Sequence, residues 1–380
     1  MKTDSKTPLH IIEFCTDFPL TGGIQTHVID LSVWLRGRGH KITFAGETGA
    51  SVSDAHCDDH LPLPMWQVTD FGKKGRISRV VALVKSAWAL RRYMQRVGAD
   101  IVHAHETAPA IVARLATLGL GVPVMMTFHG SAPNRVAGAA KVARWCTDLT
   151  VSPSKISLNA LIAAGLPAER AKVLGLGIRP LPGESASQGA ALRAQYLPGG
   201  KGTLIFSASR LDPQKGIDVM IDVAKRVVAR HPDTLFVVGG GGPLADEVEG
   251  WAEAGGVAQN IRFLGPINTV PQHLHACDIY LLTSRWEALP ISIVEAFRAG
   301  APVVATDCGG VSELVDDSVG ALCAVEDAAG IADVLNRLIE DQALRQGKGR
   351  AALARSAESR FEGAAVHATF EATYRALARR

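Results

Sequence analysis

Apolar runs of strand length alternate with stretches of helical spacing along almost the whole 380-residue chain. The chain begins with two such runs, LHIIEFC at 9–15 and KITFAG at 41–46, and apolar residues at helical spacing lie between them. This order predicts a strand, a helix and a second strand, which is the unit of a parallel sheet. The predicted fold class is therefore α/β, with doubly wound sheets.

The alternation occurs in two series, which predicts two domains. The first series continues with runs at 101–105, 122–130, 148–153 and 171–177, and the second has runs at 203–209, 234–242, 261–265, 278–284 and 301–307. A Pro-, Gly- and Ser-rich passage at 179–189 separates them and indicates a linker. Because ligands of such sheets bind beyond the carboxyl ends of the strands, we expect one cleft between two facing sheets.

Composition narrows the class of protein further. A hydrophobic content of 47% with 20% charged residues is typical of globular proteins. No apolar stretch reaches the roughly 20 residues of a membrane helix, and the start MKTDSKTPLH is too polar for a signal peptide. A cytoplasmic location is expected. The six cysteines are scattered without a Cys-x-x-Cys pair, so neither a zinc site nor a disulfide framework is indicated.

The net charge of +3 hides an asymmetry along the chain. Residues 1–177 carry 20 Lys and Arg against 13 Asp and Glu, a net +7, and the remainder carries 20 against 24, a net −4. This excess predicts an anionic partner for the first half, whether a lipid surface, a phosphate or a nucleic acid.

The stretch 73–97 in the basic half has eight basic residues, no acidic residue and a helical apolar pattern. The predicted apolar face comprises Val80, Val84, Ala87, Leu90, Met94 and Val97. Such a helix either binds an anionic membrane surface or packs as an ordinary helix with a solvated basic side. The residues predicted for the membrane surface are Lys73, Lys74, Arg76 and Arg79. Sparse aromatic residues argue against nucleic acid.

Two loops at strand ends carry groups that suit a phosphate. Gly22 and Gly23 precede the first helix, where their amides could approach a phosphate, although a tight turn explains them equally well. The loop SRLDPQKG at 209–216 places Arg210 and Lys215 after the first strand of the second series. Two cations there could neutralise a diphosphate, or they could simply be solvated.

The stretch EALPISIVEAFRAG brings two glutamates close to the start of a helix. Pro290 suits the first turn of a helix that ends near Gly300, so Glu287 lies in the preceding loop and Glu295 in the second turn. A helix start favours phosphate, and glutamates can accept hydrogen bonds from sugar hydroxyls. The alternative is a dipole partner plus a solvated glutamate, but the apolar run leaves Glu295 little room to face solvent.

Together these motifs resemble those of the retaining GT-B glycosyltransferases of family four. The resemblance extends from GGIQTHV through IVHAHE, TFHG and SRLDPQKG to EALPISIVEAFRAGAPVVATDCGGVSELV, and Glu287 and Glu295 match the family's Glu-x7-Glu pair. It implies two Rossmann-like domains that face a central cleft. The implied boundaries are 1–178 with a returning helix at about 362–380, a linker at 179–201, and a nucleotide-sugar-binding domain at 202–361.

The resemblance also implies roles for individual residues. The implied catalytic residues are Glu287, His129, Arg210 and Lys215, and the implied donor-binding residues are Gly22, Gly23, Arg210, Lys215, Glu287, Leu289, Pro290, Ile291 and Glu295. His105 is placed on the acceptor side, whereas spacing alone leaves His103 and His105 structural. The segment LGIR at 176–179 departs from the family, which commonly has Asn-Gly-Val-Asp there. No metal is predicted, because DAHCDDH at 54–60 fits a polar loop better than a standard ligand pattern.

The implied function is the retaining transfer of a hexose from a nucleotide-diphosphate sugar to a hydroxyl of a glycan or lipid-linked saccharide. Polysaccharide or glycolipid biosynthesis would be its setting, with attachment to the inner face of the membrane, and no cofactor is expected besides the donor substrate. Two alternatives are a nucleotide-sugar epimerase of the same architecture, which would turn over the donor without an acceptor, and a non-catalytic nucleotide-sugar-binding protein.

Overall fold

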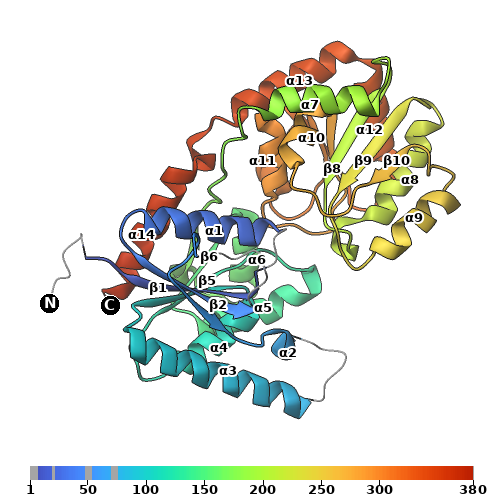
Figure 1. The fold of residues 1–380 in the computed structure, drawn as a ribbon. Coiled ribbons are helices and arrows are strands. Elements are labelled where there is room, and N and C mark those ends of the chain that lie inside the picture. The colour runs from blue at the N-terminus through green and yellow to red at the C-terminus, as the bar shows by residue number, and fades with distance from the viewer. Residues whose placement is uncertain (1–6, 19–21, 48–53, 70–75, 380) are drawn as a thin grey trace. The chain divides into compact units, whose positions relative to one another are not determined.

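The computed structural model describes residues 7–18, 22–47, 54–69 and 76–379. Contacts between Cα atoms divide the chain into an N-terminal unit, Met1–Gly177 with Glu362–Arg380, and a C-terminal unit, Ile178–Phe361. Each unit is built on one parallel sheet with helices packed against it (Figure 1). The predicted α/β fold class is confirmed.

Seven parallel strands form the sheet of the N-terminal unit, in the order β3-β2-β1-β4-β5-β6-β7. The strands are β1 (His10–Asp17), β2 (Lys41–Glu47), β3 (Asp59–Pro62), β4 (Ile101–His105), β5 (Val124–Thr127), β6 (Leu149–Ser152) and β7 (Ala171–Val173). The helices are α1 (Gly23–Arg36), α2 (Trp66–Thr69), α3 (Arg76–Val97), α4 (Thr107–Thr117), α5 (Val136–Cys146), α6 (Lys155–Ala163) and α14 (Gly363–Ala378).

The central strand β1 contributes to two separate cores, because successive side chains of a strand point to opposite faces of the sheet. Ile11 packs with residues of α1 and α14, whereas Ile12 packs with residues of α3 and α4. Most side chains at the centre of this sheet are therefore apolar and buried. Glu13, His103 and His105 are polar exceptions, and they are buried as well.

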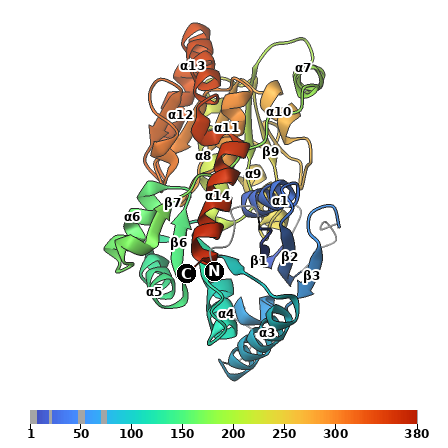
Figure 2. The ribbon, with the colours of Figure 1, turned by 90° about the vertical axis from the view of Figure 1, so that its left-hand side faces the viewer.

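Helix α14 belongs to the N-terminal unit although it follows the C-terminal unit in the sequence. It lies beside α1 (Figure 2). Its side chains Phe370 and Tyr374 are fully buried and pack in the same core as the apolar face of α1. The last helix of the chain thus completes one face of the first sheet.

Six parallel strands form the sheet of the C-terminal unit, in the order β10-β9-β8-β11-β12-β13. The strands are β8 (Thr203–Ala208), β9 (Thr234–Gly239), β10 (Ile261–Phe263), β11 (Ile279–Leu282), β12 (Val303–Thr306) and β13 (Gly320–Cys323). The helices are α7 (Ser185–Tyr196), α8 (Ile217–Val228), α9 (Ala245–Ala254), α10 (Val270–Ala276), α11 (Ile291–Arg298), α12 (Ala328–Glu340) and α13 (Gln342–Arg355).

Three features of the structure differ from the sequence-based expectations. Residues 179–201, expected to be a linker, contain helix α7, which packs on α10 within the C-terminal unit. Gly189 permits this packing, because a Cβ atom there would lie 2.7 Å from the Cβ atom of His275. Strands β3 and β13 were not predicted. Both are short edge strands, and β3 has the polar sequence DHLP.

The apolar face predicted for the basic helix was wrong in its first half. Helix α3 buries Ala87, Leu90 and Met94 as expected, but Val80 and Val84 are exposed. The reason is that the beginning of α3 packs through other positions, such as Ala82, and turns a second apolar stripe outward. The exposed stripe comprises Ile77, Val80, Val81, Val84 and Trp88, and we call it the α3 stripe.

The burial of α14 predicts that Phe370→Ala will destabilise the N-terminal unit by about 3–5 kcal/mol, through lost apolar burial and a residual cavity. Chemical denaturation followed by fluorescence will measure the loss, with Thr369→Ala on the exposed side of the same helix as the control. An equal effect of the two substitutions would contradict the packing described for α14.

Candidate functional site

The first candidate site is built in the C-terminal unit by loops that follow β8 and β11. After β8, the loop 209–216 contains Asp212, whose carboxylate accepts hydrogen bonds from the Arg210 guanidinium at 2.5 Å and from the Lys215 backbone N–H at 3.3 Å. Asp212 is buried, while Arg210 is 61% exposed. The loop therefore has an internal anchor that leaves the outer face of the Arg210 guanidinium accessible.

The loop after β11 supplies the carboxylate that pairs with Lys215. Glu287 Oε1 accepts hydrogen bonds from Lys215 Nζ at 2.5 Å and from Ser284 Oγ at 2.7 Å. Thr306 in turn donates from Oγ1 to the Ser284 carbonyl oxygen at 2.5 Å. No described residue donates a hydrogen bond to Glu287 Oε2. One oxygen of this largely buried carboxylate is thus fixed, and the other is available as an acceptor.

Two glycines in left-handed conformations permit the loops to approach so closely. Gly216, with φ +62°, lies against the Thr283 carbonyl oxygen, and a Cβ atom would come within 2.3 Å of that oxygen. Gly309, with φ +54°, leaves only 1.8 Å between such a Cβ atom and the Glu287 carbonyl oxygen. Any larger side chain at Gly309 would both strain the backbone and displace Glu287.

Helix α11 begins directly after this loop. Pro290 is its N-cap residue, and Gly300, with φ +74°, follows its C-terminus. Glu295 is half-buried in α11. Burial raises the pKa of Tyr280 and lowers the pKa of Arg298, and the nearby charge of Glu295 acts upward on both pKa values. Glu295 therefore interacts with residues of its own unit, and these interactions allow a glutamate within the apolar run ISIVEAF.

Arg285 fastens the loop after β11 to the start of α8 and to the residues after β13. Its guanidinium forms ion pairs with Asp218 at 2.6 Å and with Glu326 at 2.5 Å, and it also donates to the Pro213 carbonyl oxygen. Sequence reasoning missed Arg285 and Ser284, although both lie in the motif SRWEALP. Their partners are 41 to 72 residues away or depend on the loop conformation, so spacing carried no signal for them.

The second candidate site lies in the N-terminal unit, at the ends of β4 and β5. His129 follows β5, and its Nε2 lies 3.1 Å from His105 Nδ1. The two rings are stacked, with centroids 5.4 Å apart. His129 also donates its backbone N–H to Glu106 Oε1 at 2.8 Å. His129 itself is partly exposed, whereas His105 behind it is buried.

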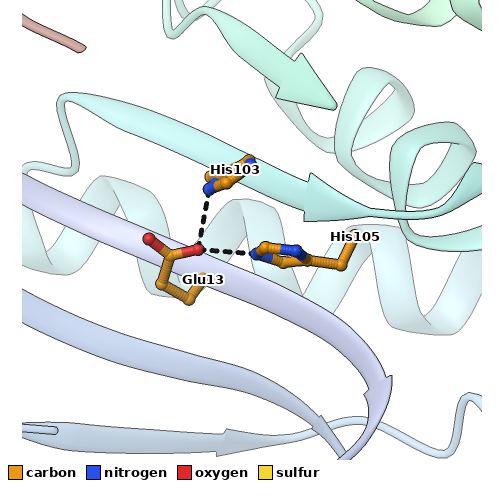
Figure 3. Close-up of side chains that lie close together, drawn as sticks. All are labelled: Glu13, His103 and His105. Atoms are coloured by element: carbon orange, nitrogen blue, oxygen red, sulfur yellow. Dashed lines mark hydrogen bonds and ion pairs between the residues drawn. The ribbon is translucent and has the colours of Figure 1, made fainter. Parts of the chain in front are cut away.

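A fully buried carboxylate lies behind His105 (Figure 3). Glu13 Oε2 is 2.9 Å from His105 Nε2 and 2.9 Å from His103 Nδ1, and Glu13 Oε1 accepts a hydrogen bond from the Tyr374 hydroxyl at 3.0 Å. The two histidines hold the pKa of Glu13 well below its usual range despite its burial. Burial lowers the pKa of His105 to about 4, so its ring is neutral at physiological pH.

The donor atoms of Glu13, His103 and His105 lie within 4.8 Å of one another, a spacing that a metal ion could bridge. Their existing contacts argue against this use. Both carboxylate oxygens and the facing ring nitrogens already form hydrogen bonds within the protein, and the group is almost completely shielded from solvent. The chemistry of the set fits a closed hydrogen-bond network better than an open coordination site.

Some of the predicted site residues lie close together in the structure, and others lie beside residues that the structure does not describe. Arg210, Lys215 and Glu287 lie together in the C-terminal unit, beside the helix start at Leu289, Pro290 and Ile291. Gly22 and Gly23 lie at the start of α1, but residues 19–21 before them fall outside the described residues.

His105 is not free to contact a ligand, because both its ring nitrogens already have partners. In DAHCDDH, Asp58 pairs with Arg36 and Asp59 accepts from Tyr93. Asp58 and Asp59 therefore stabilise the local structure through contacts with other side chains.

The comparisons with known proteins agree with this architecture. Residues 21–180 match the Glycosyltransferase Family 4 family, and residues 190–358 match the Glycosyl transferases group 1 family. A phosphatidyl-myo-inositol mannosyltransferase of Mycolicibacterium smegmatis is 28% identical over 344 residues, which cover 87% of this chain and 84% of the relative. A galactosyltransferase of Escherichia coli that acts on GlcNAc-diphosphoundecaprenol is 27% identical over 69% of this chain and 72% of its own length.

Solved structures show the same fold. HepE from Anabaena in complex with UDP-glucose superimposes with a TM-score of 0.78 at 23% identity, covering 96% of this chain and 98% of that chain. WaaG, a glycosyltransferase of lipopolysaccharide biosynthesis, superimposes with a TM-score of 0.76 at 19% identity, covering 95% of this chain and 99% of that chain.

The fold and the two family matches define a GT-B glycosyltransferase, an enzyme of the retaining hexosyltransferase class. The chain belongs to the group 1 glycosyltransferases of family four. Where the chain is described, no helix combines the length and the hydropathy that crossing a bilayer requires.

Glu106 is a site residue that the sequence analysis did not single out, and it carries a pH-dependent prediction. Burial raises the pKa of Glu106 to about 7. A carboxyl whose pKa is raised by folding favours the folded state at low pH, and this contribution is lost as the pH rises from about 4.5 to about 7. Compared with the Glu106→Gln variant, the wild-type protein should therefore lose up to about 3 kcal/mol of stability across this window.

Urea denaturation at a series of pH values will measure that difference. Comparison with the variant is needed because the buried histidines, whose pKa values are lowered, give a slope of opposite sign. Glu169→Gln, at an exposed glutamate of the same unit, is the control. Parallel stability curves for the wild type and Glu106→Gln would contradict the raised pKa.

Proposed function

We propose that the protein transfers a hexose from a nucleotide-diphosphate sugar to a hydroxyl of a lipid-linked or glycan acceptor, with retention of anomeric configuration. The observation that carries this proposal is the arrangement of Lys215, Ser284 and Glu287, which fixes one carboxylate oxygen and leaves the other available. Glu287 Oε2 can accept a hydrogen bond from a sugar hydroxyl. A carboxylate suits a hydroxyl ligand better than a phosphate, because only the hydroxyl carries a proton to donate.

The cations of the same site suit the diphosphate of the donor. Arg210 has an accessible guanidinium that can bind phosphate oxygens in a bidentate way. Lys215 lies close to the C-terminal end of its own loop, beside Glu287, and supplies a second positive charge. Because each cation already pairs with a carboxylate, binding of a diphosphate must compete with Asp212 for Arg210 and with Glu287 for Lys215.

The transfer requires stabilisation of the leaving group more than an enzymic nucleophile. The bond between the sugar C1 atom and the phosphate oxygen breaks, and a bond between C1 and the acceptor oxygen forms on the same face of the sugar. The acceptor proton passes to the departing phosphate, so the products are a glycoside and a nucleoside diphosphate. Arg210, Lys215 and the start of α11 would stabilise the charge that develops on that phosphate. Gly22 and Gly23 at the start of α1 are the donor-binding residues proposed for the N-terminal unit, where their amides suit an anion.

Further residues complete the proposed assignments. Leu289, Pro290 and Ile291 present the first turn of α11 to the diphosphate, and Glu295 binds the ribose. His129 binds the donor sugar. UDP is the nucleotide in the solved relative HepE, and the galactosyltransferase relative also uses a UDP-sugar, so UDP-hexoses are the first donors to test, followed by GDP-, ADP- and dTDP-hexoses.

A lipid-linked acceptor is supported by the α3 stripe. Five apolar side chains between 77 and 88 occupy neighbouring positions on the helix surface, and all are exposed, from 46% at Val81 to 82% at Ile77. Exposed Lys85 and Arg92 flank them, and the Arg92 guanidinium lies over the Trp88 ring. Apolar residues edged by basic ones are typical of a helix that lies on an anionic membrane.

Of the four residues predicted to contact the membrane, Lys73 and Lys74 lie outside the described residues. Arg79 donates to the Val68 carbonyl oxygen and is half-buried. The proposed membrane surface is therefore centred on the α3 stripe. The relative from Mycolicibacterium smegmatis is a phosphatidyl-myo-inositol mannosyltransferase, and phosphatidylinositol is itself a membrane lipid.

The assignment of Glu287 predicts that Glu287→Gln will lower kcat by about 10- to 100-fold, which corresponds to one lost charge-assisted hydrogen bond. Release of nucleoside diphosphate from a UDP-hexose in the presence of phosphatidylinositol or an undecaprenyl-diphosphate-linked sugar will be the assay. Glu249→Gln, at an exposed residue of α9, is the matched control. Near-normal turnover by Glu287→Gln would remove the central residue of the proposal, and turnover of the donor without any acceptor would favour an epimerase.

The membrane assignment predicts that Val84→Glu will weaken binding to phosphatidylglycerol vesicles by about 10-fold or more, because it places a negative charge within an apolar contact. Sedimentation with vesicles of phosphatidylglycerol or phosphatidylcholine will measure the binding. Leu353→Glu alters a similarly exposed leucine on α13 and should leave binding unchanged. Equal losses for both variants, or no preference for the anionic vesicles, would contradict the proposed surface.

A further inference from the structure

The buried network behind His129 has no role in the function proposed above, yet it reaches His129 directly. It runs from the carboxylate of Glu13 through the ring of His105 to the ring of His129, with heavy-atom distances of 2.9 and 3.1 Å. Each contact needs one donor and one acceptor, so the choice made at Glu13 sets the protonated nitrogen of each ring in turn. The network therefore determines which nitrogen of His129 bears hydrogen.

The proton positions follow from the charge of Glu13. His103 and His105 both hold the pKa of Glu13 low, so the carboxylate is ionised and can only accept. His105 must then donate from Nε2. Because the His105 ring is neutral, its Nδ1 carries a lone pair and accepts from Nε2–H of His129. Desolvation and the neighbouring histidines hold the pKa of His129 well below its usual value, so this ring is neutral too and its Nδ1 is left without a proton.

The surroundings also fix the orientation of the His129 ring. On one side it stacks on His105 with an interplanar angle of 23°. His27 packs against it edge-on, with ring centroids 6.4 Å apart. The backbone N–H of His129 is held by Glu106. Within the described part of the chain, no residue forms a hydrogen bond with His129 Nδ1.

We propose that Glu13 and His105 are positioning residues that hold His129 in the tautomer with its proton on Nε2. His129 therefore presents the Nδ1 lone pair and accepts a hydrogen bond from a hydroxyl of the bound sugar. An ionised phosphate oxygen has no proton to offer and cannot occupy this position productively. The identity of the ligand rests on the proposed function, whereas the tautomer does not.

The Nδ1 lone pair of His129 would discriminate between donor sugars by the hydroxyls that they carry. A hexose needs a hydroxyl at the position that meets His129 Nδ1, and a deoxy sugar that lacks it would leave the lone pair unpaired. Such a site rejects the analogue that lacks the hydroxyl more strongly than a purely apolar pocket rejects a missing methylene group. Glu13 and His105 would thus influence donor specificity without contacting the sugar, because they act through His129.

The tautomer is tested first, on the full-length protein without any ligand. Nitrogen-15 NMR of the histidine-labelled protein distinguishes a protonated from an unprotonated ring nitrogen, and His129→Asn identifies the signals of His129. We expect hydrogen on Nε2 and none on Nδ1. A proton on Nδ1 of His129 would overturn the proposal whatever the activity of the enzyme.

Two substitutions of His105 separate positioning from packing. His105→Phe retains a stacked ring but removes both hydrogen bonds, so the two tautomers of His129 should mix and kcat should fall by about 10-fold, the equivalent of one hydrogen bond. His105→Asn places an amide oxygen near the position of Nδ1, so it should retain the His129 tautomer and recover most of the loss. Thr127→Val removes the hydrogen bond on the far side of His103 and serves as the control.

Donor analogues complete the test. A panel of monodeoxy UDP-hexoses should contain one that the wild-type enzyme and Thr127→Val reject and that His105→Phe no longer distinguishes from its parent. Unchanged discrimination in His105→Phe, with mixed tautomers, would overturn the specificity role. If the protein turned over no nucleotide sugar while the tautomer was as expected, the proposed function would fail and the network would stand.

Discussion

Polar groups buried where parallel strands end must find partners inside the protein, because a charge or a hydrogen-bonding group without one costs several kcal/mol there. This constraint organises both units. In the N-terminal unit the carboxylate of Glu13 is held by His103, His105 and Tyr374. In the C-terminal unit Glu287 is held by Lys215 and Ser284. Each network leaves one group on its outer side without a partner among the described residues, namely Nδ1 of His129 and Oε2 of Glu287.

Each outward group is a hydrogen-bond acceptor held by its own unit, and each suits a hydroxyl donor. The two networks consist of partners from distant parts of the chain: Tyr374 lies 361 residues from Glu13, and Lys215 lies 72 residues from Glu287. In the proposed function, acceptors held in this way would meet sugar hydroxyls with little movement of their own side chains, whereas the diphosphate must compete for Arg210 and Lys215. In the same proposal, the exposed cation of Arg210 and the start of α11 would add the positive potential that a diphosphate needs.

Much of the fold could be predicted from the pattern of apolar residues. The strands with long apolar runs, such as β1, β8 and β11, were expected from their sequences. Strand β3 was not expected because its sequence DHLP is polar, and β13 was not expected because its four residues GALC form only a short apolar run. The Pro-, Gly- and Ser-rich residues 179–189 suggested a linker, but the small size of Gly189 instead permits α7 to pack on α10. For α3, periodicity identified the helix and misplaced part of its buried face, because apolar residues occur on two sides of it.

The sequence by itself determined the fold class and the family, since these are properties of local pattern and motif. The same motifs predicted Arg210, Lys215, Glu287, Glu295 and His129 as site residues. Only the tertiary structure decided which of those groups are paired and which remain available. Glu13 lies in an ordinary strand pattern, Glu106 looks like any loop glutamate, and Tyr374 lies in a terminal helix. Their importance comes from contacts between elements that are distant in the chain, and hydrogen-bond partners at such separations leave no periodic signal in a single sequence.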